Sequence, residues 1–280
     1  MSAEKATSLR RAVTLLLALA SDDALSDGGL GVVALTQLLG DEKSRVSRTL
    51  RTLQEYGLVE RDPDTLAYRI GWRVYALADR AGNAALLEAA PAKVSALVRE
   101  FGESAHLSVL QGAQVLTVVS RPSPQAVSTV SLVGRHVPAH CTSAGRALLL
   151  DHDFEALERM FGSAPLPAAG PRAPRTVAEL YQRIRDARAV GYAAVIEESE
   201  AGLVAAAAPV RDHRGRIAAA LNLSAPAFRF QERLAQAGER LVGVAEELSV
   251  AVGWRRPEPA AAQADGTPAQ ADAAPAQADL

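Results

Sequence analysis

Cysteine is almost absent from this chain of 280 residues, and long hydrophobic runs are absent as well. The single cysteine, Cys141, excludes an intramolecular disulfide and a metal cluster built from several thiolates. No apolar run reaches the ~18 residues that a membrane span needs, and no signal peptide opens the sequence. We therefore expect a cytoplasmic protein with no membrane partner.

The chain also lacks an excess of charge of either sign. Its formal net charge is −2 and charged residues make up 22% of it, which excludes a globally basic coat for nucleic acid. Basic character is local instead, because positions 43–51 contain Lys and Arg but no acid. A hydrophobic content of 49% and this length suffice for two domains with ordinary cores.

Signatures of catalysis and metal binding are missing too. The sequence contains no Gly-x-Ser-x-Gly elbow and no Gly-rich phosphate loop. His136 and His140 have a helical metal-ligand spacing, but Pro138 lies between them. Glu197 and Glu198 are adjacent, so on a strand their carboxylates would point to opposite faces. We predict no enzymatic activity, no metal and no cofactor.

Residues 40–55 are the most informative segment that is present. Val46, Leu50 and Leu53 are spaced as the buried stripe of a helix, and basic and hydroxyl residues cover the rest of it. Such a face suits water, or an anionic surface rich in acceptors such as the DNA major groove. Residues expected at base edges are Ser44, Arg45, Ser47 and Arg48. Residues expected at phosphates are Lys43 and Arg51, with Arg61 and Arg69 from the segment that follows.

The segments before this helix favour the DNA interpretation. Val32–Leu39 is typical of a short apolar helix, and Gly40 permits a tight turn, which together predict a helix-turn-helix. A further helix is expected at Leu9–Ala20, with Thr7 or Ser8 as its N-cap.

The segment after it predicts a wing. Gly57 is placed to end the helix, and residues 58–61 and 66–70 flank an Asp-Pro-Asp turn, which is typical of a hairpin. Three helices and a hairpin predict a winged helix-turn-helix DNA-binding domain over residues 7–71. A winged helix that serves protein contacts, attached to a sensor domain, is the alternative.

Residues 72–90 predict a linker helix that could also pair with its copy in a dimer. The helical pattern continues to Phe101, with a break expected at Pro91. Residues 91–253 predict an effector-binding domain. Residues 254–280 are rich in Pro, Ala, Gln and Asp and predict a disordered tail.

The sequence pattern of the second domain predicts a mostly antiparallel sheet with helices packed on it. Strands are expected at 105–110, 115–120, 127–133, 193–196, 203–210 and 217–223. Thr176 to Glu179 form a capping box, so a helix should start there and end at Gly191. A last helix is expected from Pro226 to about Val252.

Small residues at 140–146 predict the start of another helix. Its free N–H groups could bind a carboxylate, or the small residues could simply pack closely against a sheet. A helix-start position could also lower the pKa of Cys141 and leave a redox role open.

The chain as a whole resembles the IclR family of bacterial transcriptional regulators. The resemblance extends from residue 7 to about 253. The segments that carry it are 43–48, 56–61, 68–71, 133–148, 191–192, 197–198, 202, 206–210 and 222–226.

This resemblance implies an α+β protein with an N-terminal winged helix-turn-helix, a linker helix and a GAF-like effector domain. It also implies a dimer, or a dimer of dimers, on a pseudo-palindromic double-stranded DNA operator. The implied effector is a small organic or aromatic acid. Effector identity, operator sequence and the sign of regulation are not set by these residues.

The positions that the resemblance assigns to the effector pocket depart from members that bind small keto acids. Where those members have an acid, a cysteine and a first serine, this chain has Val195, Ala205 and Asn222, and only Ser224 is kept. We therefore expect a ligand larger and less polar than glyoxylate or pyruvate, or a pocket that senses none. The full set of expected effector residues is Cys141, Thr142, Ser143, Ala144, Val195, Ala205, Asn222 and Ser224.

Overall fold

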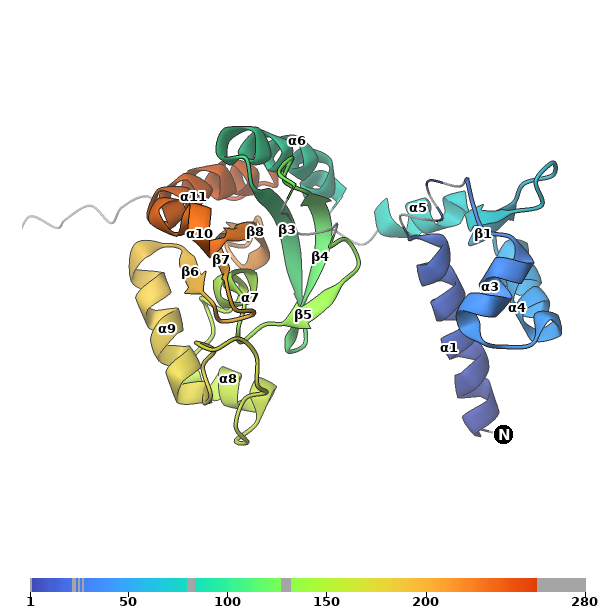
Figure 1. Ribbon diagram of the computed structural model, residues 1–280, viewed down its shortest axis with the longest axis horizontal. Coiled ribbons are helices and arrows are strands. Elements are labelled where there is room, and N and C mark those ends of the chain that lie inside the picture. Colours follow the sequence, from blue (N-terminus) through green and yellow to red (C-terminus); the bar gives the residue numbers. More distant parts are fainter. Residues whose placement is uncertain are drawn as a thin grey trace, which may run out of the picture.

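The computed structural model describes residues 2–21, 24, 26, 28–79, 84–126 and 132–255. The described elements form an N-terminal body (α1 to α5) and a C-terminal body (α6 to α11), both drawn in Figure 1. The predicted strand at 127–133 and the predicted tail at 254–280 lie largely outside the described residues.

The N-terminal body is a three-helix unit followed by a two-stranded hairpin, as predicted. Its elements are α1 (Ser2–Leu19), α3 (Val32–Leu39), α4 (Lys43–Glu55), β1 (Val59–Arg61), β2 (Tyr68–Ile70) and α5 (Trp72–Asp79). Gly40 adopts the left-handed conformation between α3 and α4, with φ 59°. α1 begins earlier than predicted, so Thr7 and Ser8 lie inside the helix rather than at its cap.

A small core fixes α4 within this body. Val46, Leu50 and Leu53 are buried against α1, α3 and β1, which confirms the predicted apolar stripe. The Arg11 guanidinium of α1 donates a hydrogen bond to Asp41, in the turn before α4. This bond lowers the pKa of the Asp41 carboxyl. One face of α4 is therefore anchored and the other is free.

The C-terminal body is built on one six-stranded sheet in the order β5-β4-β3-β8-β7-β6. Its strands are β3 (Ser104–Gln111), β4 (Gln114–Arg121), β5 (His136–Pro138), β6 (Ala193–Ile196), β7 (Leu203–Arg211) and β8 (Ile217–Pro226). Every described pair is antiparallel. The predicted α+β architecture is confirmed.

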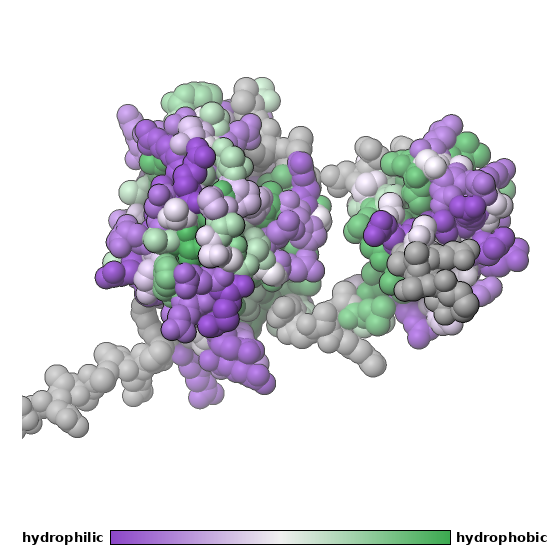
Figure 2. All heavy atoms as spheres, turned by 90° about the horizontal axis from the view of Figure 1, so that it is seen from below, coloured by the Kyte–Doolittle hydropathy of each residue, from purple (hydrophilic) through white to green (hydrophobic). Residues whose placement is uncertain are grey.

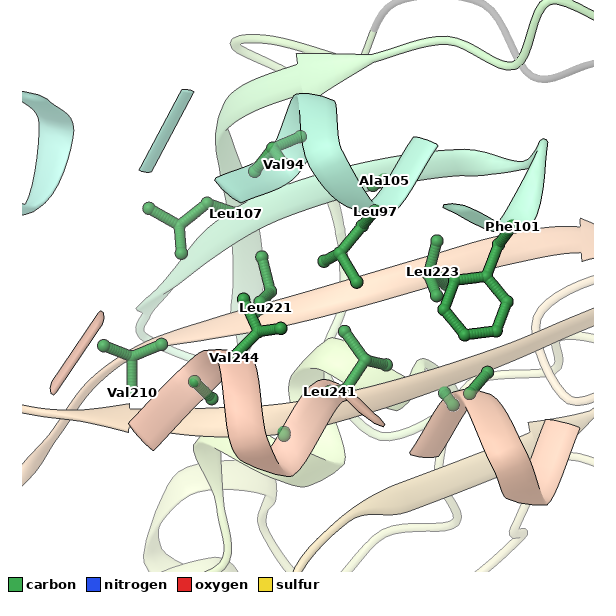
Figure 3. Close-up of a cluster of buried hydrophobic side chains, with 14 of the residues drawn as sticks. Val94, Leu97, Phe101, Ala105, Leu107, Val210, Leu221, Leu223, Leu241 and Val244 are labelled. Atoms are coloured by element: carbon green, nitrogen blue, oxygen red, sulfur yellow. The ribbon is translucent and has the colours of Figure 1, made fainter. Parts of the chain in front are cut away.

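Helices cover the two faces of this sheet. α6 (Ala84–Phe101) and α11 (Leu234–Ala251) lie on one face, and α7 (Ser143–Leu148), α8 (Phe154–Phe161) and α9 (Val177–Val190) on the other (Figure 1). Figure 3 shows the first face, where Leu107, Leu221 and Leu223 of β3 and β8 meet apolar side chains of α6 and α11. This face is an apolar core closed by α6 and α11.

Two further helices, both in the C-terminal body, differ from expectation. α6 runs through Pro91 without a break. Its residues Leu86, Ala90, Val94 and Leu97 are buried on the sheet, and this packing offsets the hydrogen bond that proline cannot donate. The predicted helix at 226–252 is three pieces, α10 (Ala227–Phe230), a 3₁₀ turn (Gln231–Arg233) and α11. Among the described helices, none is long and apolar enough to cross a bilayer.

Candidate functional site

The free face of α4 carries the predicted basic and hydroxyl side chains. Ser44, Arg48 and Arg51 are exposed and share that face, and Ser47 beside them is half-buried. Among the described residues, neither Arg48 nor Arg51 forms an ion pair. A row of unpaired guanidinium and hydroxyl groups on a protruding helix can donate to phosphates and to base edges.

The other predicted basic residues are partly engaged by the protein. Arg45 lies 3.3 Å from Glu42 and 3.9 Å from Asp41. Arg69 lies 3.3 Å from Glu60 across the hairpin. The Arg61 guanidinium stacks over Tyr68, and Lys43 is exposed at the start of α4. Because acids hold Arg45, Arg48 is better placed than Arg45 to read a base.

A second kind of surface is apolar. In Figure 2, green hydrophobic residues gather at the left edge of the N-terminal body, where α5 lies in Figure 1, and purple hydrophilic residues cover its right side. Large apolar side chains exposed on α1 and α5 are Leu9, Val13, Leu17, Trp72, Tyr75 and Leu77. On α1 these residues recur every four positions, which makes a continuous stripe.

The C-terminal body contains a cavity of about 570 Å³, open on one side, between the sheet and the start of α7. This size is typical of small-molecule sites. All eight residues expected at the effector site line it: Cys141, Thr142, Ser143, Ala144, Val195, Ala205, Asn222 and Ser224.

Sheet register brings the residues from β6, β7 and β8 together. Val195 pairs with Ala205, and Ala205 pairs with Ser224, so three expected positions form one row across three strands. Asn222 lies two residues before Ser224, on the same face of β8. Valine and alanine make this part of the wall apolar.

β3 and β4 contribute a polar floor that the sequence reasoning missed. His106 and Ser108 of β3 and Thr117 of β4 line the cavity. The His106 ring nitrogens lie 2.9 Å from the Ser120 hydroxyl and 3.2 Å from the Ser224 hydroxyl. Burial lowers the pKa of His106 to about 4, so its imidazole is neutral at pH 7. The alternation of polar residues at 106 and 108 within an apolar strand was the signal for this floor.

The start of α7 packs closely against the segment before it, which is one of the two alternatives left open by the sequence. A Cβ on Gly145 would lie 2.1 Å from the Ala139 carbonyl oxygen, so glycine is required there for close packing. Thr142 caps the helix by accepting the Gly145 N–H at 3.1 Å, while Ser143 and Ala144 face the cavity. α7 has only six residues and therefore a weak dipole.

The Arg135 guanidinium is better placed than the start of α7 to attract the carboxylate of a ligand. Arg135 lines the cavity, is exposed, and forms none of the ion pairs found among the described residues. Glu200 lines it as well, and Ser199 lies beside Glu200. A ligand carboxylate would therefore be drawn toward Arg135 and away from Glu200.

Cys141 is buried in the wall of the cavity, and its S–H points to the Pro138 carbonyl at 3.8 Å. Burial raises the pKa of this thiol to about 11, the reverse of the shift expected for a helix start. The thiol is therefore a poor nucleophile.

We expect Cys141 to react with a disulfide reagent at pH 8 at least about 100-fold more slowly than free cysteine, because each unit of pKa removes a factor of ten in thiolate. The release of thionitrobenzoate from Ellman's reagent measures this rate. Unfolding in guanidinium should restore ordinary reactivity. A native rate close to that of free cysteine would favour the redox role instead.

The two histidines with metal-ligand spacing each lie within hydrogen-bond distance of a different protein group. His136 lies 2.6 Å from the Gln111 amide oxygen, and His140 lies 3.1 Å from the Pro167 carbonyl. Glu198 is buried and pairs with the buried Arg146 and, at 2.7 Å, with Arg183. Glu198 therefore links α7 and α9 through ion pairs. Glu197 lies beyond the end of β6 with a positive φ of 55°.

A basic helix on a winged body, joined to a domain that contains a metabolite-sized cavity, defines a ligand-responsive transcriptional regulator. Residues 8–63 match the IclR helix-turn-helix domain, and residues 79–250 match the bacterial transcriptional regulator IclR C-terminal domain. The chain belongs to the IclR family of bacterial transcriptional regulators. It is a transcriptional regulator with a DNA-binding helix-turn-helix domain and an effector-binding C-terminal domain.

Relatives of known name are transcriptional regulators. The glycerol operon regulatory protein of Streptomyces coelicolor is 32% identical over 83% of this chain and 88% of its own length. The regulator XynR of Escherichia coli is 28% identical over 75% of this chain and 86% of its own. An IclR homologue from Microbacterium hydrocarbonoxydans, solved in complex with 4-hydroxybenzoate, is 26% identical with a TM-score of 0.65, covering 88% of this chain and 97% of that one.

Proposed function

We propose that α4 lies in the major groove of an operator, with Ser44, Ser47 and Arg48 at base edges and Arg45 released from its acids to join them. The remaining basic side chains, Lys43, Arg51, Arg61 and Arg69, then contact phosphates and hold the helix in register. What supports this assignment is the single row of exposed, unpaired side chains on α4.

The operator-bound form is a dimer or a dimer of dimers, and its site is pseudo-palindromic. The apolar stripes on α1 and α5 support self-association, because exposed contiguous apolar surface marks an interface. Two recognition helices then need half-sites about 34 Å apart, or a multiple of that distance. Residues 7–71 bind DNA, residues 72–90 link, residues 91–253 sense, and the protein works in the cytoplasm where its operator lies.

The effector that fits the cavity best is an aromatic carboxylic acid. A volume of about 570 Å³ is far larger than a three-carbon keto acid needs. Val195 and Ala205 make one wall apolar, and Arg135 supplies a cation for the carboxylate. The 4-hydroxybenzoate found in the homologue from Microbacterium hydrocarbonoxydans supports this class of ligand.

We expect 4-hydroxybenzoate or another aromatic acid to bind the full-length protein and to change its affinity for operator DNA. Pyruvate and glyoxylate should bind weakly, because they leave most of the cavity unfilled. Calorimetric titration measures the binding, and the anisotropy of labelled operator measures the coupling, which we expect to be 5–150-fold in DNA affinity, or about 1–3 kcal/mol. Tight binding of pyruvate would contradict the proposal.

A further inference from the structure

Among the described residues that line the cavity, Asn222 is the one with a buried side-chain atom that lacks a hydrogen-bond partner. It is 8% exposed, and its amide oxygen is buried with no hydrogen-bond partner among the described residues. It lies on β8 directly opposite His106 of β3, and it lines the cavity. Buried amides are almost always bonded, so an unbonded one in a residue that lines a cavity points to a missing partner.

None of the neighbouring polar groups bonds this oxygen, and each has a partner of its own. His106 lies within hydrogen-bond distance of Ser120 on one side and Ser224 on the other. Ser108 and Thr117 lie 3.4 Å from each other. Among these floor residues, Asn222 alone has a buried side-chain atom without a partner.

The charges around the cavity decide which group of a ligand goes where. The floor carries no net charge, since the His106 imidazole is neutral at pH 7. Arg135 carries the positive charge of the lining, so a carboxylate belongs at that residue. The group that meets Asn222 then belongs to another part of the ligand, and to satisfy a carbonyl oxygen it must be a donor.

We propose that Asn222 is a specificity-determining residue that accepts a hydrogen bond from a hydroxyl group of the effector. The effector is then a hydroxylated aromatic acid rather than an aromatic acid in general. This inference rests on the proposed function, because it refines the ligand class of the same cavity. A site built to bond a hydroxyl rejects the analogue that lacks it, since the analogue leaves the amide unpaired.

The test compares four ligands on the full-length protein by calorimetric titration: benzoate, 3-hydroxybenzoate, 4-hydroxybenzoate and 4-methoxybenzoate. We expect the tighter of the two hydroxy acids to bind at least about tenfold more tightly than benzoate. The methoxy acid has the oxygen but no donor, so it should bind no better than benzoate. In Asn222→Leu, which keeps the approximate shape, the ratio of the Kd values for benzoate and the hydroxy acid should fall to near one.

The Kd ratio is measured within each variant, so a general loss of stability does not produce the expected result. Thr117→Val is the matched control, because its hydroxyl lies in the same cavity but is already paired with Ser108. That variant should keep the ratio.

Equal binding of benzoate and both hydroxy acids by the unmodified protein would overturn the proposal and leave the aromatic-acid effector intact. A ratio that survives in Asn222→Leu, or falls equally in Thr117→Val, would overturn the assignment to Asn222. If none of the four acids binds, the aromatic-acid effector itself is refuted and the proposal with it.

Discussion

Replacing Glu198 with glutamine should lower the free energy of unfolding of the C-terminal body by about 3–5 kcal/mol. The side chains of Glu198 and Arg146 are 8% and 3% exposed, and Arg183 pairs with the same carboxylate. Burial already lowers the pKa of the Arg146 guanidinium, and the carboxylate of Glu198 opposes that effect. Without the carboxylate, a buried cation is left uncompensated.

Calorimetry of thermal unfolding measures this effect, which corresponds to a transition roughly 6–20 °C lower for a domain of this size. Glu155→Gln is the matched control, because Glu155 also faces an arginine, at 3.7 Å, but is 81% exposed. It should change stability by at most about 0.5 kcal/mol. The double variant Arg146→Met/Glu198→Met should recover part of the loss, since no uncompensated charge is left between these two positions. Equal effects of Glu198→Gln and Glu155→Gln would show that the buried pair contributes little.

Arg48→Ala should weaken binding to the operator by about 1–3 kcal/mol, or roughly 5–150-fold, and should weaken binding to random DNA far less. Arg48 lies on the exposed face of α4 and forms no ion pair with a described residue. An arginine guanidinium can form two hydrogen bonds to one guanine. The alanine variant lacks both bonds, and it also lacks the discrimination between bases that they supply. The anisotropy of a duplex selected from random sequences, and of a scrambled duplex, measures both losses.

Arg51→Ala is the control for this experiment, because Arg51 lies one turn further along the same face. As a phosphate contact it should weaken both duplexes by the same factor and reduce the salt slope by about one. If Arg48→Ala behaves in the same way, Arg48 does not read a base.

Local patterns predicted most of the helix and strand positions. The capping box at Thr176 and the stop at Gly191 bound α9 as expected. The apolar stripe Val46, Leu50 and Leu53 placed the buried side of α4 correctly. These features depend on residues within a few turns of one another, which is why the sequence reveals them.

Features that depend on distant pairing were not predictable from local patterns. β3 pairs with β8, more than 100 residues later, and only this register brings His106 opposite Asn222. The break predicted at Pro91 was wrong because burial of the surrounding stripe outweighs the local preference of proline. The eight effector positions were placed by family resemblance, and their binding role stays a prediction until ligands are titrated.

The short connection between α6 and β3 has a mechanical consequence. α6 ends at Phe101, and β3, which carries His106 at the cavity, begins at Ser104. Eighteen helical residues form a rod about 27 Å long. A tilt of about 5° at the cavity end displaces the far end, near Ala84, by about 2 Å. Any such tilt, however small, would be carried along α6 from the strand that bears His106 to the end of the helix nearest in sequence to the DNA-binding domain.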